Sequence, residues 1–179
     1  MKDSLEEALT RHAKYKWIPR LTTDEENAIT RYTDIDIYGS VNKTLRDATN
    51  ILGNPVIGEL IKGIESGLKK FRYSKSLTVY RSVSEEEYIF IENNNVINSF
   101  SDFKSTTICK IKALNISQNK TKYLILAQLP AYVNGAYIAP LSKFEDEKEF
   151  LLNRESNYKI ISKQHDTEKD VKYIFLKVV

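Results

Sequence analysis

The spacing of the apolar residues changes between Phe71 and Leu77, and this change constrains the fold more than any other feature of the chain. Up to Phe71 the apolar residues recur at helical spacing, whereas from Leu77 onward they form short runs rich in Tyr, Ile, Val and Thr. The first pattern predicts amphipathic helices and the second predicts strands. A helical first half packed against a strand-rich second half indicates α+β architecture, for which we expect a two-sheet core of mixed or antiparallel strands.

Start and stop signals divide the first half into helices. One begins near Ser4 and ends before Pro19. Thr22-Thr23-Asp24-Glu25-Glu26 contains the Thr-x-x-Glu capping box, which satisfies free amide groups at the start of a second helix. A third helix is expected around residues 38–46. Asn54-Pro55 then supplies an N-cap and a proline at the first helical position of a fourth helix, whose apolar stripe continues to Phe71.

The second half is predicted to consist mainly of strands, with a short helix that opens at Ser84. The strands are expected at Leu77–Arg81, Ser105–Cys109, Tyr123–Leu129, Ala136–Ile138, Glu149–Asn153, Tyr158–Ser162 and Val171–Val179. A chain of 179 residues is about the size of one domain. We therefore expect residues 1–179 to form a single domain, mainly helical over 1–73 and strand-rich over 77–179.

Charge and composition argue against several classes of partner. The 27 Lys and Arg residues are balanced by 24 Asp and Glu residues mixed along the chain, so we expect no nucleic-acid partner. There is no apolar run long enough to cross a membrane, and the acidic start of the chain does not resemble a secretion signal. Cys109 has no second cysteine to pair with, and together with His12 and His165 it matches no familiar metal-site spacing. We therefore expect no membrane partner and no metal site.

The strongest local signal for chemistry is an acidic loop, Phe144-Glu145-Asp146-Glu147-Lys148, that runs into the apolar strand beginning at Glu149. Side chains along a strand alternate between its two faces, so Glu147 and Glu149 are expected to point the same way. Taken alone, Glu145, Asp146, Glu147 and Glu149 are better explained as a solvated turn.

Two further features lie on neighbouring strands. Arg81 ends an otherwise apolar strand and is expected to have an anionic partner, either a ligand or a neighbouring acid in a structural ion pair. Ser105-Thr106-Thr107 places three hydroxyls at the start of another strand. These hydroxyls could orient a carboxylate, or they could simply reflect the preference of Thr for strands.

The order arginine, Ser-Thr-Thr and Glu-x-Glu resembles the mono-ADP-ribosyltransferase toxins of the Arg-Ser-Glu type. Gly135–Ser142 and Glu147–Arg154 are similar to the strands and loop that form the family's catalytic edge, and Leu21–Arg46 is similar to the helical segment that covers its NAD site. The resemblance extends over residues 17–179. It implies the ADP-ribosyltransferase fold and a transferase that cleaves NAD, transfers ADP-ribose to an arginine of a target protein and releases nicotinamide without a metal.

The resemblance also implies roles for individual residues. Arg81 would bind an NAD phosphate, Ser105 would orient Glu149, and Thr106 and Thr107 would shape the nicotinamide pocket. Glu149 would hydrogen-bond the nicotinamide ribose and stabilise the cation that forms as the glycosidic bond breaks.

Four more positions complete this expected site. Glu147 would draw in a protonated guanidinium and help to remove its proton, and Phe144 would contact the target protein. Tyr38 and Asn42 would support the NAD site. Ser82 stands where many relatives carry a second arginine, and this departure affects the expected NAD contacts.

Other functions and several partners stay open. The chain could be an NAD glycohydrolase, for which Glu147 would be dispensable, or a non-catalytic module that binds another toxin component. As a transferase it would modify actin or a bacterial protein, and a delivery component or an immunity protein could accompany it. We expect a secreted or injected toxin or effector with a role in virulence that acts in the cytoplasm of a target cell, or alternatively a cytoplasmic enzyme of the phage type.

Overall fold

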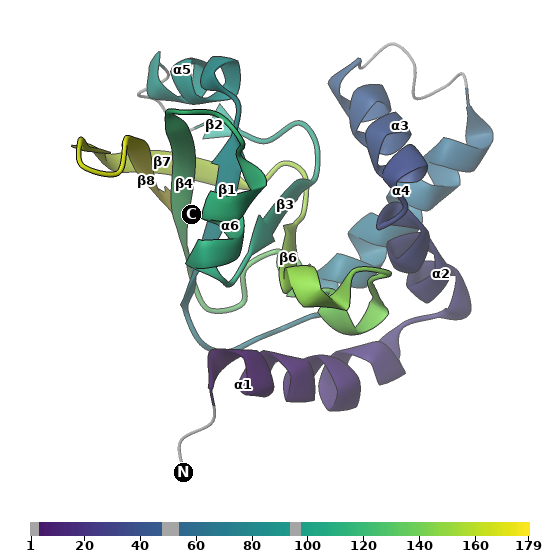
Figure 1. Cartoon of the computed structure of the whole chain (residues 1–179). Coiled ribbons are helices and arrows are strands. Elements are labelled where there is room, and N and C mark those ends of the chain that lie inside the picture. The colour runs from purple at the N-terminus through teal and green to yellow at the C-terminus, as the bar shows by residue number, and fades with distance from the viewer. Residues whose placement is uncertain (1–3, 48–53, 94–97) are drawn as a thin grey trace.

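The computed structural model describes residues 4–47, 54–93 and 98–179. A group of helices from the first half of the chain lies beside a strand-rich unit from the second half, and α1 runs beneath both (Figure 1). The helices are α1 (Leu5–His12), α2 (Thr23–Tyr32), α3 (Ile35–Arg46), α4 (Pro55–Lys69), α5 (Glu85–Asn93) and α6 (Lys110–Ile116). The strands are β1 (Leu77–Val83), β2 (Asn98–Ser99), β3 (Lys104–Thr107), β4 (Lys122–Leu129), β5 (Gly135–Tyr137), β6 (Glu149–Leu152), β7 (Asn157–Asp166) and β8 (Val171–Val178).

Three of the predicted helix starts of the first half are confirmed, whereas the helix expected around residues 38–46 begins earlier, at Ile35. Ser4 and Glu7 form a capping box at α1, and Thr22 and Glu25 form another at α2. The Asn54 side chain accepts from the amide of Ile57 at the start of α4. After α1 the chain continues as a π-helical turn to Trp17, as expected, but a 3-10 turn, Ile18–Arg20, then carries the helical backbone past Pro19. These caps satisfy amide groups that would otherwise lack partners at the helix ends.

Four elements of the second half differ from the expectation. The strand that begins near Ser105 ends at Thr107, and Cys109 stands at the N-cap position of a short helix, α6, that was not predicted. The short strand β2 was not predicted either. The remaining predicted strands are present, and β7 is longer than expected.

The expectation of a two-sheet core is wrong, because the strands form one eight-stranded sheet. Its order is β2-β7-β8-β4-β1-β3-β6-β5, and every pair is antiparallel except β4 with β8. The strand β1 pairs along its whole length with β4 but meets β3 at a single residue pair, Tyr80 and Thr107. This narrow junction joins two strand groups into one sheet, and a pattern of strand-forming residues does not report it.

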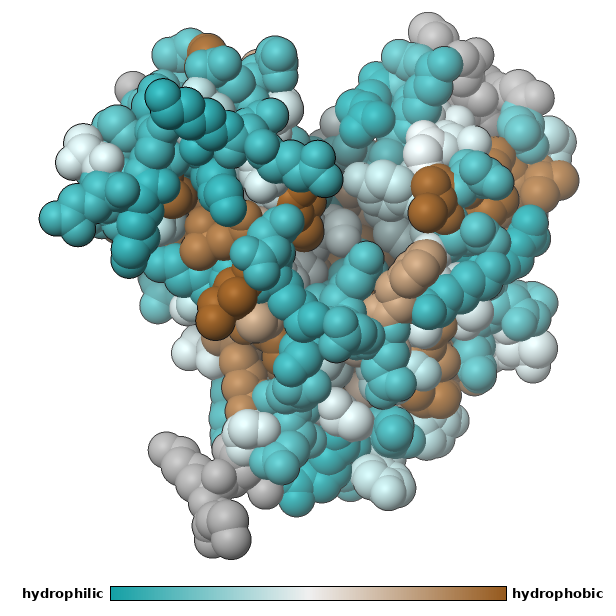
Figure 2. All heavy atoms as spheres, viewed as in Figure 1, coloured by the Kyte–Doolittle hydropathy of each residue, from teal (hydrophilic) through white to brown (hydrophobic). Residues whose placement is uncertain are grey.

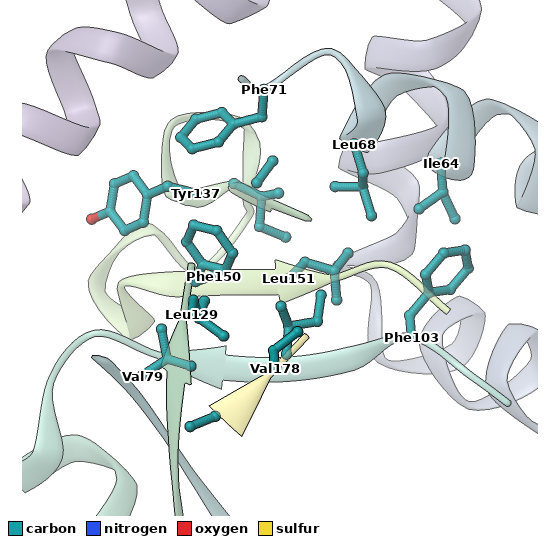
Figure 3. Packing of buried hydrophobic residues seen from close by; sticks show 14 of the residues in the cluster. Ile64, Leu68, Phe71, Val79, Phe103, Leu129, Tyr137, Phe150, Leu151 and Val178 are labelled. Atoms are coloured by element: carbon teal, nitrogen blue, oxygen red, sulfur yellow. The ribbon is translucent and has the colours of Figure 1, made fainter. Parts of the chain in front are cut away.

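The helix α4 covers one face of this sheet. Ile64 and Leu68, together with Phe71 beyond the helix end, pack toward Phe150 and Leu151 of β6 in the main hydrophobic core (Figure 3). All of these side chains are at most 1% exposed. Burial of this apolar stripe stabilises a helix that its glycines would otherwise weaken.

Gly63 and Gly67 let α4 lie unusually close to α2. A Cβ atom on Gly67 would lie 2.7 Å from Cδ1 of Ile29, and one on Gly63 would lie 2.8 Å from Cβ of Ala28. The carbonyl of Gly67 also accepts a hydrogen bond of 2.8 Å from Nε1 of the buried Trp17. The two glycines are therefore part of the packing that fixes α2, which borders the cleft described next.

Among the described residues, no helix is both long and apolar enough to cross a membrane.

Candidate active site

A cleft of about 730 Å³ lies between the helices of the first half and the strand-rich unit. Figure 2 shows the hollow between these two parts of the surface. Tyr32 and Tyr38 line the helical side, and residues of β1, β3, α6 and the loop before β6 line the other. All the predicted site residues except Asn42 contribute to its wall, namely Tyr38, Arg81, Ser105, Thr106, Thr107, Phe144, Glu147 and Glu149.

Glu149 is the buried carboxylate of this cleft. It is the first residue of β6, pairs with Thr107 of β3 and is 6% exposed. The Ser105 hydroxyl donates to its Oε1 atom, as the sequence predicts. Burial raises the pKa of Glu149 to about 7, with a smaller push from the charge of Glu147, while the Ser105 hydrogen bond and the Arg81 charge oppose the rise. The side chain therefore changes charge near neutral pH.

Glu147 reaches the same cleft by a route that differs from the expectation. The two glutamates do not lie on one strand, because Glu147 ends a 3-10 turn, Glu145–Glu147, and β6 begins only at Glu149. Between them Lys148 has a left-handed backbone, with φ of 52°. The hydroxyl of Thr107 donates to the carbonyl of Glu147 over 2.8 Å. The prediction that both carboxylates share a site holds, but strand alternation is not the reason.

Arg81 has an anionic partner within the chain, which the sequence analysis left open. Its Nη1 atom donates to the carbonyl of Ser105 over 3.0 Å, and its Nη2 atom lies 3.2 Å from Oε2 of Glu87 on α5. Its Nε atom is buried and has no hydrogen-bond partner among the residues that the structure describes. Desolvation lowers the pKa of Arg81, but the charge and hydrogen bond of Glu87 together with the charges of Tyr38 and Asp102 outweigh it, so the pKa is raised and the guanidinium stays charged. Glu87 is not among the predicted site residues, although it lies on the helix that is predicted to open at Ser84.

The Arg81 pair is one end of a chain of alternating charges. Lys104 Nζ lies 3.4 Å from Glu87 Oε1 and 2.9 Å from Asp102 Oδ1. Asp102 in turn accepts from Nη1 of Arg46 on α3 over 2.9 Å. The network links the helical side of the molecule to the strand that carries Arg81.

Some of the remaining predicted residues line the cleft, and others support the residues that line it. Thr106 donates its hydroxyl to the carbonyl of Phe150, which joins β3 to β6. Tyr38 lies edge-on to Tyr32 with ring centroids 5.5 Å apart. Asn42 is buried behind Tyr32 and donates to its hydroxyl over 2.9 Å, so it does not border the cleft itself. Phe144 is exposed at the rim.

The helix α6 adds a part of the wall that sequence reasoning did not anticipate. Lys112, Asn115 and Ile116 all face the cleft from this helix. Its N-cap residue, Cys109, is half-buried and makes no side-chain cap hydrogen bond, so no capping signal marks the helix in the sequence. Within residues 4–47, 54–93 and 98–179, no group of three His, Cys, Asp or Glu side chains could hold a metal ion.

A family model described as ADP-ribosyltransferase exoenzyme matches residues 9–179. The chain belongs to the ADP-ribosyltransferase exoenzyme family. It is 36% identical over 150 residues to a protein of Enterococcus faecalis named NAD(+)--arginine ADP-ribosyltransferase EFV. That match covers 81% of this chain but 30% of the Enterococcus protein, so the chain spans less than a third of that relative.

Solved structures share this exoenzyme fold. Plx2a, an ADP-ribosyltransferase toxin from Paenibacillus larvae, superposes with a TM-score of 0.79 at 22% identity, over 97% of this chain and 96% of that one. An ADP-ribosyltransferase from Clostridium botulinum gives the same TM-score of 0.79 at 18% identity, over 99% of this chain and 96% of that one. At these identities the likeness concerns the fold, and it agrees with the predicted α+β class.

Proposed function

We propose that the chain is a mono-ADP-ribosyltransferase that cleaves NAD and transfers ADP-ribose to an arginine of a target protein, with release of nicotinamide. The observation that carries this proposal is the buried Glu149, held by the Ser105 hydroxyl in a cleft that Glu147 and Arg81 also line. A buried carboxylate fixed by a neutral donor suits the stabilisation of a cation. The name of the Enterococcus relative supports arginine as the acceptor.

The proposed reaction exchanges one bond to the ribose for another. The bond between the nicotinamide nitrogen and ribose C1′ breaks, and its electron pair leaves with nicotinamide. The ionised Glu149 accepts a hydrogen bond from the ribose and stabilises the oxocarbenium-like cation, as carboxylates do in glycosidases. A guanidinium nitrogen of the acceptor then forms a bond to C1′ and gives a proton to Glu147.

The other cleft residues have supporting roles in this proposal. Arg81 binds the diphosphate of NAD, because a guanidinium offers paired donors and a permanent charge. Thr106 and Thr107 shape the nicotinamide end of the cleft. Tyr38 contributes to the wall, and Asn42 acts through Tyr32, which it holds in place.

Phe144 stands at the cleft rim beside Glu147 and is the proposed contact for the target protein. That target is a protein with an accessible arginine, either actin or a bacterial protein. We propose that the enzyme is a secreted or injected toxin or effector that acts inside a target cell, alongside a delivery component or an immunity protein. A phage-type enzyme that acts in the cytoplasm of its own host cell is the alternative.

Transfer of label from tagged NAD to proteins in eukaryotic and bacterial lysates tests the proposal. We expect a labelled band with the wild type and its loss in both Glu147→Gln and Glu149→Gln. The control Glu59→Gln removes a carboxylate from an exposed ion pair on α4 and should keep the band. Nicotinamide release that depends on Glu149 but not on Glu147, with no band in either lysate, would instead indicate a glycohydrolase. No nicotinamide release from the wild type would favour the non-catalytic binding module.

A further inference from the structure

The loop that carries Glu147 is held by three ion pairs, which reach the residue before α3, the helix α6 and the helix α1. Lys143 Nζ lies 2.5 Å from Oδ2 of Asp34, the residue before α3. Asp146 Oδ2 lies 2.7 Å from Nζ of Lys112 on α6. Lys148 Nζ lies 2.5 Å from Oε2 of Glu6 on α1. We call residues 142–148 the tethered loop.

The pair between Lys148 and Glu6 is the least exposed of the three. The two side chains are 27% and 44% exposed, whereas Asp146 is 92% exposed and the partners Lys143 and Asp34 are 50% and 45% exposed. Screening by water is therefore weaker for this pair than for its neighbours. Lys148 directly follows Glu147 in the chain, so its left-handed backbone bears on the direction of that glutamate.

The backbone at Lys148 needs external support. A left-handed conformation is unfavourable for a residue with a Cβ atom and persists where the surroundings hold it. Here the amide of Lys148 donates to the carbonyl of Glu145 over 3.1 Å, and its carbonyl accepts from the amide of Ile108 over 3.2 Å. The hydrogen bond from the Lys148 ammonium to Glu6 adds a third point of attachment.

The helix that provides this attachment is itself held by buried side chains. The helix α1 lies directly below the tethered loop, and its segment carries three side chains that are fully buried, Leu9, Ala13 and Trp17. Its start is fixed by the capping box of Ser4 and Glu7. An ion pair to a residue on a packed helix can orient a loop, whereas a pair between two freely moving side chains cannot.

We infer that Glu6 and Lys148 are positioning residues for Glu147, so that α1 serves the transfer step although it does not border the cleft. This inference rests on the proposed function, because it uses the role of Glu147 toward the acceptor. Glu149 has its own support, since Ser105 and the pairing of β6 with β3 fix it. Loss of the Glu6 contact should therefore impair transfer and leave cleavage of NAD by water nearly unchanged.

The experiment measures two rates on the purified chain. One is transfer of ADP-ribose from NAD to agmatine, a small guanidinium acceptor, and the other is nicotinamide release without acceptor. The variants are Glu6→Gln, Lys148→Met and the double exchange Glu6→Lys with Lys148→Glu. The matched control is Glu7→Gln, which removes a carboxylate from the same helical turn, where the side chain only caps Ser4 and an amide can replace it.

We expect both single variants to lower transfer about two- to fivefold, the range typical of an exposed to half-exposed ion pair. Nicotinamide release and the melting temperature should stay close to wild type, and the double exchange should restore most of the transfer. Glu7→Gln should behave as the wild type does.

Equal losses of both rates, no loss of transfer, or no recovery in the double exchange would overturn the inference. Failure of the proposed function gives a different result, because the wild type itself would then show no transfer that depends on Glu147. In that case the inference fails with it.

Discussion

The hydrogen bond from Ser105 to Glu149 opposes the burial that raises the pKa of this carboxyl to about 7. Ser105→Ala removes the donor. A hydrogen bond to a charged group contributes about 1.5–3 kcal/mol, and about 1.4 kcal/mol corresponds to one pH unit. Its loss should raise the pKa of Glu149 to roughly 8–9. At pH 7 the ionised fraction then falls from about one half to between about 1% and 10%.

The assay is nicotinamide release from NAD, measured as kcat/KM between about pH 5.5 and pH 9.5, because this parameter reports the ionisation of the free enzyme. The reaction needs the carboxylate, so activity should fall as the pH drops through the pKa of Glu149. We expect the acidic limb near pH 7 in the wild type and about one to two pH units higher in Ser105→Ala, with recovery of most activity at high pH.

Ser105→Thr keeps a hydroxyl at the same position and is the matched control, whose acidic limb should stay near pH 7. An unshifted limb in Ser105→Ala would refute the reasoning, because it would mean that the hydroxyl does not stabilise the charged carboxylate. A loss of activity that is the same at every pH would refute it equally, since it would assign Ser105 a role unrelated to ionisation.

Further predictions concern stability. Because the pKa of Glu149 is about 7 in the folded chain against an ordinary value of 4.5, the ionised side chain lowers the free energy of unfolding as pH rises from 4.5 through 7. Glu149→Gln should therefore raise the free energy of unfolding by up to about 3 kcal/mol at pH 8 and by little at pH 4, in urea titrations at the two pH values. Gly67→Ala should lower the free energy of unfolding by about 1–3 kcal/mol, because the new Cβ meets Ile29. Gly39→Ala on α3 should be neutral or stabilising, because a Cβ there has no other atom within 4 Å. Burial against aromatic rings lowers the pKa of His12 below 6.5. The stability that the neutral His12 contributes is therefore present above pH 6.5 and is lost as the pH falls through the pKa of the folded chain. His12→Gln should flatten the dependence of the free energy of unfolding on pH in this range.

Much of the fold follows from local sequence signals. The capping residues Ser4, Thr22 and Asn54 mark helix starts that the structure contains, and the runs of β-branched and aromatic residues mark most of the strands. The number of sheets does not follow, because it depends on one contact between Tyr80 and Thr107. Sequence patterns report the faces of a strand and not its neighbours.

The candidate site also has a part that the sequence predicts and a part that it does not. The pattern brings Arg81, Ser105 and Glu149 together, because they lie on strands that become neighbours of one another in the sheet. The partner of Arg81 was not predicted, since Glu87 reaches it from a helix. The direction of Glu147 depends on the left-handed backbone of Lys148, a conformation that nothing in a lysine side chain signals.

The place of β8 in the sheet makes the cleft depend on a strand that lies beyond every cleft residue in the sequence. This strand is the last of the described elements, yet it lies between β7 and β4, and β4 is the neighbour of β1. A nascent or truncated chain that stops before Val171 contains every cleft residue but leaves the apolar β4 as an open edge. Open edges of this kind favour aggregation over folding. A chain cut before Val171 should therefore form the cleft poorly, although it holds all of the residues that line it.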